Sequence, residues 1–302
     1  MTATAAPRLR YLDADTLAKL QTMALRARTV VEGALTGLHR APHYGTSVEF
    51  AEHKEYSPGD EIRHIDWKAY GKFDKYYVKR FEQETELRAY LCLDASGSMG
   101  YAGAGRRSKL EFAAYLAASL AYLLIRQQDQ VGLSVLGGTA PVYLPARGRP
   151  QHLADLLGAL DQVAPAGPTD LVRALERLHE GMRRRAMLIV LSDLFAPPAI
   201  IRERLAHLRA RGHEVVLFHV LDPDETAFPF DGLTLFESLE EDRRLLCDTR
   251  ATRRAYLREM NAFLEGWRNA AVESNLTYLP VDTARPLDRV LSEFLVGQDR
   301  RR

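Results

Sequence analysis

The stretch LCLDASGSMG, residues 91–100, decides the fold of this chain because it joins a core strand to a polar loop. It begins as an apolar run, stops at an aspartate and continues with small hydroxyl residues and glycines. From about residue 87 onward, similar apolar runs alternate with amphipathic segments, a pattern typical of parallel β-α-β units. Polar groups at the end of a core strand need a partner, which can be a helix cap, a phosphate, a reacting substrate or a metal ion.

The rest of the alternation predicts a doubly wound α/β domain with a mostly parallel sheet and one antiparallel edge strand. The antiparallel edge is expected where two apolar runs flank the turn signal Gly137-Gly138. The expected strands are residues 89–94, 131–138, 140–146, 186–194, 214–222 and 276–282. The expected helices are residues 109–128, 150–163, 170–185, 199–212, 251–274 and 286–296.

Two segments precede this domain. Residues 1–45 are expected to form an N-terminal helical segment containing an amphipathic helix. Residues 46–86 are expected to form a small β-rich addition of antiparallel strands, with the turn signal SPGD at 57–60. The α/β domain then occupies residues 87–302. Within it, residues 223–250 are a predicted hairpin insertion around an acidic turn, ESLEEDRR, which we expect to be solvated.

Composition limits the classes of function. The chain has 302 residues and a formal net charge of +1, so no overall charge attracts it to nucleic acid or to an anionic membrane. Its most apolar helical stretch, residues 110–126, is short for a membrane span and carries Glu111 and Arg126 near its ends. Cys92 and Cys247 have no metal-binding or redox spacing. We therefore expect a cytoplasmic protein with no secretory leader and no membrane span.

Polar residues from three separate segments are expected to meet at one edge of the sheet. In an open parallel sheet, ligands bind beyond the carboxyl ends of the strands. The polar residues of the three segments lie at such strand ends or at the start of a helix between them. Two carboxylates and three hydroxyls form an all-oxygen set, which suits a hard cation such as Mg²⁺, with Mn²⁺ or Ca²⁺ as alternatives. Such a set leaves a coordination position open for an oxygen from outside. The predicted metal ligands are Asp94, Ser96, Ser98, Thr169 and Asp193.

Each of these residues also has an ordinary structural interpretation. Ser96 or Ser98 can simply cap the helix that follows. Thr169 stands at a helix start, and Asp193 can open a turn after its strand. All three segments lie at strand ends or helix starts, in a chain order that brings them together. This coincidence favours metal binding over three unrelated turns.

The motifs DASGSM, GPTD and LSDL resemble the metal-ion-dependent adhesion site of von Willebrand factor A domains, whose five ligand positions match the five residues above. The segment EFAEHKEYSPGDEIRHIDWKAYGKFDKYYVKRFEQE, directly upstream of the site, is more specific. It resembles domain-of-unknown-function family fifty-eight, von Willebrand A-like proteins associated with MoxR-type AAA ATPases. The resemblance covers most of the chain, from about residue 40 to about residue 295.

This resemblance implies a von Willebrand A-like fold and a Mg²⁺-dependent protein-binding module rather than an enzyme. In that interpretation, an acidic residue of a partner protein enters the open position on the ion. The resemblance also implies an adaptor or co-chaperone that works with a MoxR-type AAA ATPase in the assembly or maturation of other proteins. Some relatives carry membrane segments, and this chain departs from them in that respect.

Two other functions compete with this interpretation. Residues 66–81 mix basic and aromatic side chains, as nucleic-acid-binding surfaces do, although interspersed acidic residues and the near-neutral net charge weigh against it. A metal-dependent hydrolase would use Asp94 or Ser98 as a nucleophile, or the ion to activate water. Against an enzyme, no G-x-S-x-G motif occurs, and GAGRRSK at 103–109 lacks the spacing of a phosphate loop. His219 is expected to be a core histidine rather than a base.

Overall fold

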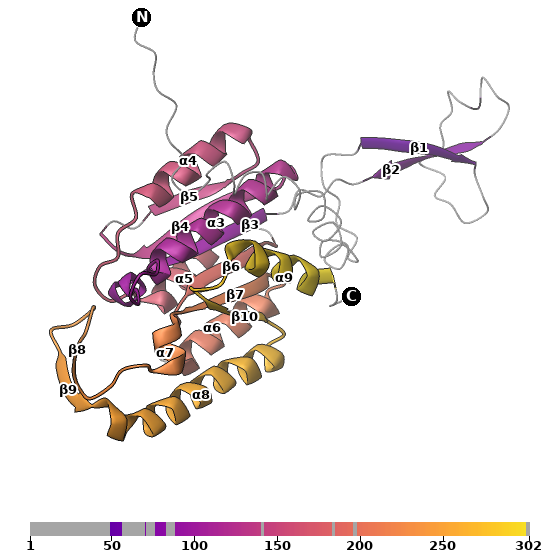
Figure 1. Cartoon of the computed structure of the whole chain (residues 1–302). Helices are drawn as coiled ribbons and strands as arrows, with labels where there is room; N and C mark the ends of the chain where they lie inside the picture. Colours follow the sequence, from indigo (N-terminus) through magenta and orange to yellow (C-terminus); the bar gives the residue numbers. More distant parts are fainter. Residues whose placement is uncertain are drawn as a thin grey trace, which may run out of the picture. The chain divides into compact units, whose positions relative to one another are not determined.

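Figure 1 shows the computed structural model of the chain. It describes residues 49–55, 70, 76–82, 88–139, 142–182, 185–195 and 198–299. The chain divides into two compact units, one made of residues 38–86 and the other of residues 1–37 and 87–302. The predicted N-terminal helical segment and the predicted turn at 57–60 lie outside the described residues, as does most of the basic and aromatic segment at 66–81.

The smaller unit contains a two-stranded antiparallel sheet, as expected for the β-rich addition. β1 (Glu49–Glu55) pairs with β2 (Tyr77–Glu82), so that Glu49 lies opposite Glu82. The register shifts between Phe50 and Glu52, which indicates a bulge. The two strands are distant along the chain and become neighbours only in the folded unit.

The larger unit is built on one six-stranded sheet. Its strands are β3 (Arg88–Ala95), β4 (Gln130–Gly137), β5 (Val142–Arg147), β6 (Met187–Ser192), β7 (Glu214–Leu221) and β10 (Thr277–Asp282). They lie in the order β10-β7-β6-β3-β4-β5, and every neighbouring pair is parallel except the antiparallel pair β4 and β5. This order confirms the predicted doubly wound sheet with one antiparallel edge. Such sheets bind ligands where the strand order reverses, which here is between β3 and β6.

The central strands are buried on both faces, which explains their nearly continuous apolar sequences. Every residue of β6 is buried, and in β3 only Arg88 is partly exposed. The edge strand β5 alternates between exposed and partly exposed residues and contains Pro145, while the opposite edge strand β10 contains Pro280. Proline lacks the N–H that a central strand needs, so an edge is where a sheet accepts it.

Helices complete the larger unit. They are α3 (Lys109–Arg126), α4 (Pro150–Asp161), α5 (Leu171–Gly181), α6 (Pro198–Ala210), α7 (Pro223–Ala227), α8 (Thr249–Glu273) and α9 (Leu287–Asp299). Between α7 and α8, strands β8 (Leu233–Glu237) and β9 (Arg244–Asp248) form an antiparallel hairpin. This hairpin lies within the insertion predicted from the sequence.

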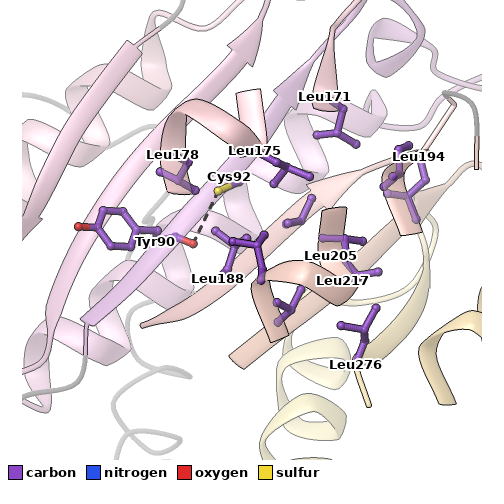
Figure 2. Close-up of a cluster of buried hydrophobic side chains, with 14 of the residues drawn as sticks. Tyr90, Cys92, Leu171, Leu175, Leu178, Leu188, Leu194, Leu205, Leu217 and Leu276 are labelled. Carbon is purple, nitrogen blue, oxygen red and sulfur yellow. Dashed lines mark hydrogen bonds between the residues drawn. The ribbon is translucent and has the colours of Figure 1, made fainter. Parts of the chain in front are cut away.

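One core cluster joins the sheet to α5, α6 and α8 (Figure 2). It contains Tyr90 and Cys92 of β3, Leu188 of β6 and Trp267 of α8. Side chains of a strand alternate between the two faces of a sheet. The strand residues that alternate with members of this cluster therefore point to the opposite face. There α3 packs on β3 and also contacts α4 and α9. Apolar side chains therefore pack on both faces of the sheet, and this packing holds the sheet and its polar edge in place.

α3 is buried along most of its length, as expected for the apolar stretch at 110–126. Its first residue, Lys109, is also buried. Among the helices of the described residues, none combines the length and the apolar character that a membrane span requires.

Candidate metal centre

The carboxyl ends of β3 and β6 bring the two predicted aspartates close together. The two strands pair in parallel up to Leu93 opposite Leu191. Asp94 follows on one strand and Ser192 on the other, and Asp94 Oδ2 accepts a 2.6 Å hydrogen bond from Ser192 Oγ. Only 4% of Asp94 and 3% of Asp193 are exposed. Parallel pairing thus places two acidic side chains in the interior at one edge of the sheet.

The loop after β3 adds the two predicted serines. Ser96 precedes, and Ser98 lies within, the 3₁₀ helix η2 (Gly97–Gly100). The Ser96 backbone N–H donates to Asp94 Oδ1 at 3.0 Å, and the hydroxyl oxygens of Ser96 and Ser98 are 3.1 Å apart. These bonds fold the loop back over the end of its own strand.

Thr169 comes from the loop that precedes α5. Its Oγ1 donates a 3.4 Å hydrogen bond to the backbone oxygen of Leu136 in β4. Gly137 makes this approach possible, because a Cβ atom at that position would collide with Thr169 Oγ1. The backbone N–H of Gly97 donates to the Gly167 oxygen at 2.7 Å, which ties this loop to η2. Thr169 is therefore held beside the β3 loop although the two are distant in sequence.

The helices next to the site are capped by other residues than the predicted ligands. Ser96 precedes η2, but its side chain makes no capping hydrogen bond. Helix α3 is capped by Ser108 and helix α5 by Asp170, which leaves the Thr169 hydroxyl outside the cap. For Asp193 the turn interpretation holds in part, since its Oδ1 accepts a 3.2 Å bond from the backbone N–H two residues ahead. Helix capping therefore does not account for the hydroxyl groups of the site.

Four of the five predicted ligands line one small hollow. Its free volume is about 10 Å³, the space of about one water-sized sphere. The four are Asp94, Ser96, Thr169 and Asp193. The fifth, Ser98, joins them through the hydroxyl contact with Ser96. The structure brings the predicted residues together, and their role as metal ligands stays a prediction.

A buried lysine, which the sequence analysis did not assign to the site, lies against Asp193. The Lys109 Nζ donates to Asp193 Oδ2 at 2.8 Å and to Glu225 Oε1 at 2.7 Å. Burial lowers the pKa of Lys109, but the charges of these two carboxylates outweigh it, so the pKa is raised. The sequence signal is slight: Lys109 ends the segment GAGRRSK, which bears only a superficial likeness to a phosphate loop.

The loop before α3 fixes the position of that lysine. Arg106 forms an ion pair with the fully buried Asp222, with 2.9 Å between Nη2 and Oδ1. The Tyr101 hydroxyl donates a 3.0 Å hydrogen bond to Asp224 in α7. Two of the three cations of GAGRRSK, Arg106 and Lys109, thus pair with acidic residues of the same chain, and the third, Arg107, lies over the Tyr115 ring.

The site offers two buried carboxylates with one cation beside them. Asp94 and Asp193 line the hollow, while Lys109 pairs with Asp193 and Glu225 next to it. Burial, followed by the nearby charge of Asp193, raises the pKa of Asp94. Within the described part of the chain, no group of three or more His, Cys, Asp or Glu residues forms a metal site. An ion here would therefore depend on two carboxylates supplemented by hydroxyls, a set that suits Mg²⁺.

A third acidic residue reaches the hollow from the β8–β9 hairpin. Glu240 lines it, and Glu240 Oε1 accepts a 3.2 Å hydrogen bond from the backbone N–H of Ser98. The expectation of a solvated turn holds for Glu241 and Asp242, which are exposed. It is wrong for Glu240, which is half-buried because the turn folds over η2. The acidic composition of the turn was the only sequence signal.

His219 in β7 has the surroundings expected of a core histidine. It is fully buried, and its Nδ1 shares a 2.7 Å hydrogen bond with the Tyr278 hydroxyl. Burial lowers the pKa of His219 to about 4, so the ring is neutral at pH 7.

The sheet order, the antiparallel edge and the polar strand ends define the class of this protein as von Willebrand A-like. The chain belongs to the family described as "Protein of unknown function DUF58", whose model matches residues 52–263. This confirms the family indicated by the motifs. Two relatives are "Uncharacterized protein Rv1480" of Mycobacterium tuberculosis and "Uncharacterized protein Mb1516" of Mycobacterium bovis. Each is 30% identical over 231 residues, which cover 76% of this chain and 72% of the relative.

Solved structures of similar architecture share little sequence with this chain. The conserved hypothetical protein BatB from Bacteroides thetaiotaomicron is 16% identical with a TM-score of 0.47, covering 71% of this chain and 99% of that one. An aerotolerance-related membrane protein from Bacteroides fragilis is 19% identical with a TM-score of 0.47, covering 70% and 99%. The SpRpn10 VWA domain is 10% identical with a TM-score of 0.41, covering 69% and 95%.

Proposed function

We propose that this protein is a Mg²⁺-dependent protein-binding module and not an enzyme. The observation that carries the proposal is the hollow at the end of the sheet, which is lined by carboxylate and hydroxyl residues from three segments. Asp94, Ser96, Ser98, Thr169 and Asp193 would hold the ion, with Mn²⁺ or Ca²⁺ as alternatives. The bound cation would supply an open position that attracts a carboxylate from outside.

The residues around the hollow support binding rather than turnover. Asp94 is held by Ser192 Oγ and the Ser96 N–H, and Asp193 by Lys109, so both carboxylates are fixed before any ion arrives. Lys109 offsets part of the charge without itself lining the hollow. Fixed ligand positions favour one coordination geometry for the cation. Recognition of the partner protein then depends on an acidic side chain that the partner contributes.

The proposed partner is a MoxR-type AAA ATPase, with this protein as its adaptor or co-chaperone in the maturation of other proteins. The support for this partner is the resemblance of the upstream segment to the DUF58 family, to which the chain belongs and which the resemblance associates with MoxR-type ATPases. A cytoplasmic location, where such an ATPase would act, belongs to the same proposal.

The proposal is tested by affinity capture from the native cell extract, in millimolar Mg²⁺ or in EDTA. The immobilised proteins are the wild type, Asp94→Asn and the control Asp231→Asn, whose carboxylate is exposed and pairs with Arg250. We expect an AAA ATPase to be retained by the wild type and the control in Mg²⁺ only. Capture that is equal for all three proteins, or unchanged by EDTA, would contradict a metal-gated interaction.

A further inference from the structure

The tip of the β8–β9 hairpin lies against the loop that carries the predicted ligands Ser96 and Ser98. The backbone oxygen of Leu239 approaches Gly97 of η2 so closely that a Cβ atom on Gly97 would collide with it. Gly97 lies between Ser96 and Ser98. The hairpin tip is therefore packed against the loop that carries Ser96 and Ser98.

Glu240 is the residue of this tip that turns inward. Its neighbours Leu239, Glu241 and Asp242 are exposed, whereas Glu240 is half-buried. Its carboxylate accepts a hydrogen bond from the Ser98 backbone N–H and lines the same hollow as the two aspartates. One of the chain's own acidic side chains thus lies at the hollow, where the proposed function places a carboxylate of a partner protein.

The hairpin packs one aromatic side chain, Phe236, on Phe228 and Phe230, but it leaves three leucines exposed. Leu233, Leu235 and Leu246 are 73%, 51% and 59% exposed. The base is held by Arg253, which donates to the Phe228 backbone oxygen at 3.0 Å. Apart from the packing of Phe236, the hairpin has few buried apolar contacts to lose, which lowers the free-energy cost of opening.

Electrostatics in this region depend on whether a cation is present. Glu240 lines the same hollow as Asp94 and Asp193, and of these two aspartates only Asp193 is paired with Lys109. Neighbouring carboxylates repel each other, and a divalent cation between them reverses the sign of the interaction. The three carboxylates do not form a metal-binding group in the present arrangement, so Glu240 has to move from the Ser98 N–H toward the aspartates to contact an ion.

We propose that Glu240 is an in-chain ligand for the cation, which takes the open position until an acidic residue of a partner displaces it and the hairpin swings away. This inference rests on the proposed function, because it assumes that the five predicted residues bind a divalent ion. In this inference Glu240 is a sixth ligand of the ion, and it competes with the acidic residue of the partner. Opening of the hairpin is then a step of partner binding.

The test uses Mn²⁺ alone as the probe, with the full chain as wild type, Glu240→Ala and the matched control Glu241→Ala. Glu241 is on the same tip and pairs with Arg243 in solvent. Calorimetry gives the Mn²⁺ affinity, and water-proton relaxation gives the number of exchanging waters on the bound ion. We expect Glu240→Ala to bind Mn²⁺ about tenfold more weakly, because one charged ligand is lost, and to show higher relaxivity for each bound ion. The control should match the wild type in both measurements.

A second arm titrates glutarate, a small dicarboxylate, into the Mn²⁺-loaded proteins. Glutarate should lower the relaxivity of Glu240→Ala at lower concentrations than that of the wild type, because the variant has no competing carboxylate. Equal Mn²⁺ affinity and equal relaxivity in wild type and Glu240→Ala would overturn the role of Glu240 while leaving the metal site intact. Binding by Glu240→Ala but not by the wild type would show that Glu240 excludes the ion, which also overturns it. If neither protein binds Mn²⁺, the proposed function itself fails, and this inference fails with it.

Discussion

The buried ammonium of Lys109 lies 2.8 Å from the carboxylate of Asp193, at the point where α3 begins beneath the end of β6. Only 1% of the lysine side chain and 2% of the aspartate side chain are exposed. The same nitrogen contacts Glu225, so one cation holds together the start of α3, the end of β6 and α7. This contact determines how much negative charge remains in the hollow, and it carries the first prediction.

Replacing Lys109 with Met should lower the free energy of unfolding by about 3–5 kcal/mol, because two carboxylates lose their buried cation. The measurement is urea unfolding followed by circular dichroism. Arg268→Met is the control, since its 3.1 Å pair with Glu265 is exposed and its removal should cost less than about 1 kcal/mol. Adding Glu225→Gln to Lys109→Met should recover part of the loss. A Lys109→Met protein as stable as the control would contradict this prediction.

Mg²⁺ should raise the unfolding temperature of the wild type, because an ion that binds only the folded state stabilises it. At about 100 times the dissociation constant the gain is about 2.7 kcal/mol, or roughly 5–10 °C. Asp94→Asn should show no Mg²⁺-dependent shift, yet in EDTA it should be at least as stable as the wild type because a buried charge has been removed. Thermal scans in Mg²⁺ and in EDTA provide the check. A variant that is unfolded in EDTA, or still shifted by Mg²⁺, would refute it.

Gly137→Ala should disturb Thr169 specifically. Gly137 has a φ of +72°, and its added Cβ would collide with Thr169 Oγ1. Gly105→Ala is a matched control, because Gly105 has a φ of +71° and nothing within 4 Å of the added atom. Both variants should lose about 1–3 kcal/mol from the backbone conformation. Only Gly137→Ala should also lose Mg²⁺ affinity in calorimetry, and equal affinities for the two variants would rule out a role for Thr169.

Acidification should destabilise the protein through His213. Burial, and then the charge of His179, lower the pKa of His213 below its ordinary value of 6.5, while in the unfolded chain the ring titrates normally. Below pH 6.5 the unfolded state therefore binds the proton more readily, and this group's contribution is lost as the pH falls. The loss is at most about 1.4 kcal/mol per pH unit for one group.

The check compares the wild type with His213→Asn, whose side-chain oxygen can still accept from the Ala186 N–H as His213 Nδ1 does. Urea unfolding at pH 7 and pH 5 should show a smaller loss of stability in the variant. If both proteins lose the same amount, His213 does not contribute to the acid sensitivity.

The sequence alone was sufficient for the architecture of the larger unit. Continuous apolar runs predicted the central strands β3 and β6, because a strand that is buried on both faces has apolar residues at successive positions. The Gly137-Gly138 signal placed the antiparallel edge, and apolar strands that stop at Asp94 and Asp193 indicated the edge that carries the site. These features are encoded locally, in the periodicity of neighbouring residues, and so they can be read without coordinates.

Only the tertiary structure showed how that site is balanced and covered. Lys109 and Asp193 are 84 positions apart, and Ser98 and Glu240 are 142 apart. A lysine at a helix start and a glutamate in an acidic turn look like ordinary solvated residues in the sequence. The packing of α3 beneath the sheet and the fold of the hairpin over η2 give these two charges their partners. Contacts of this kind depend on how distant segments close on one another in three dimensions, which local sequence periodicity does not encode.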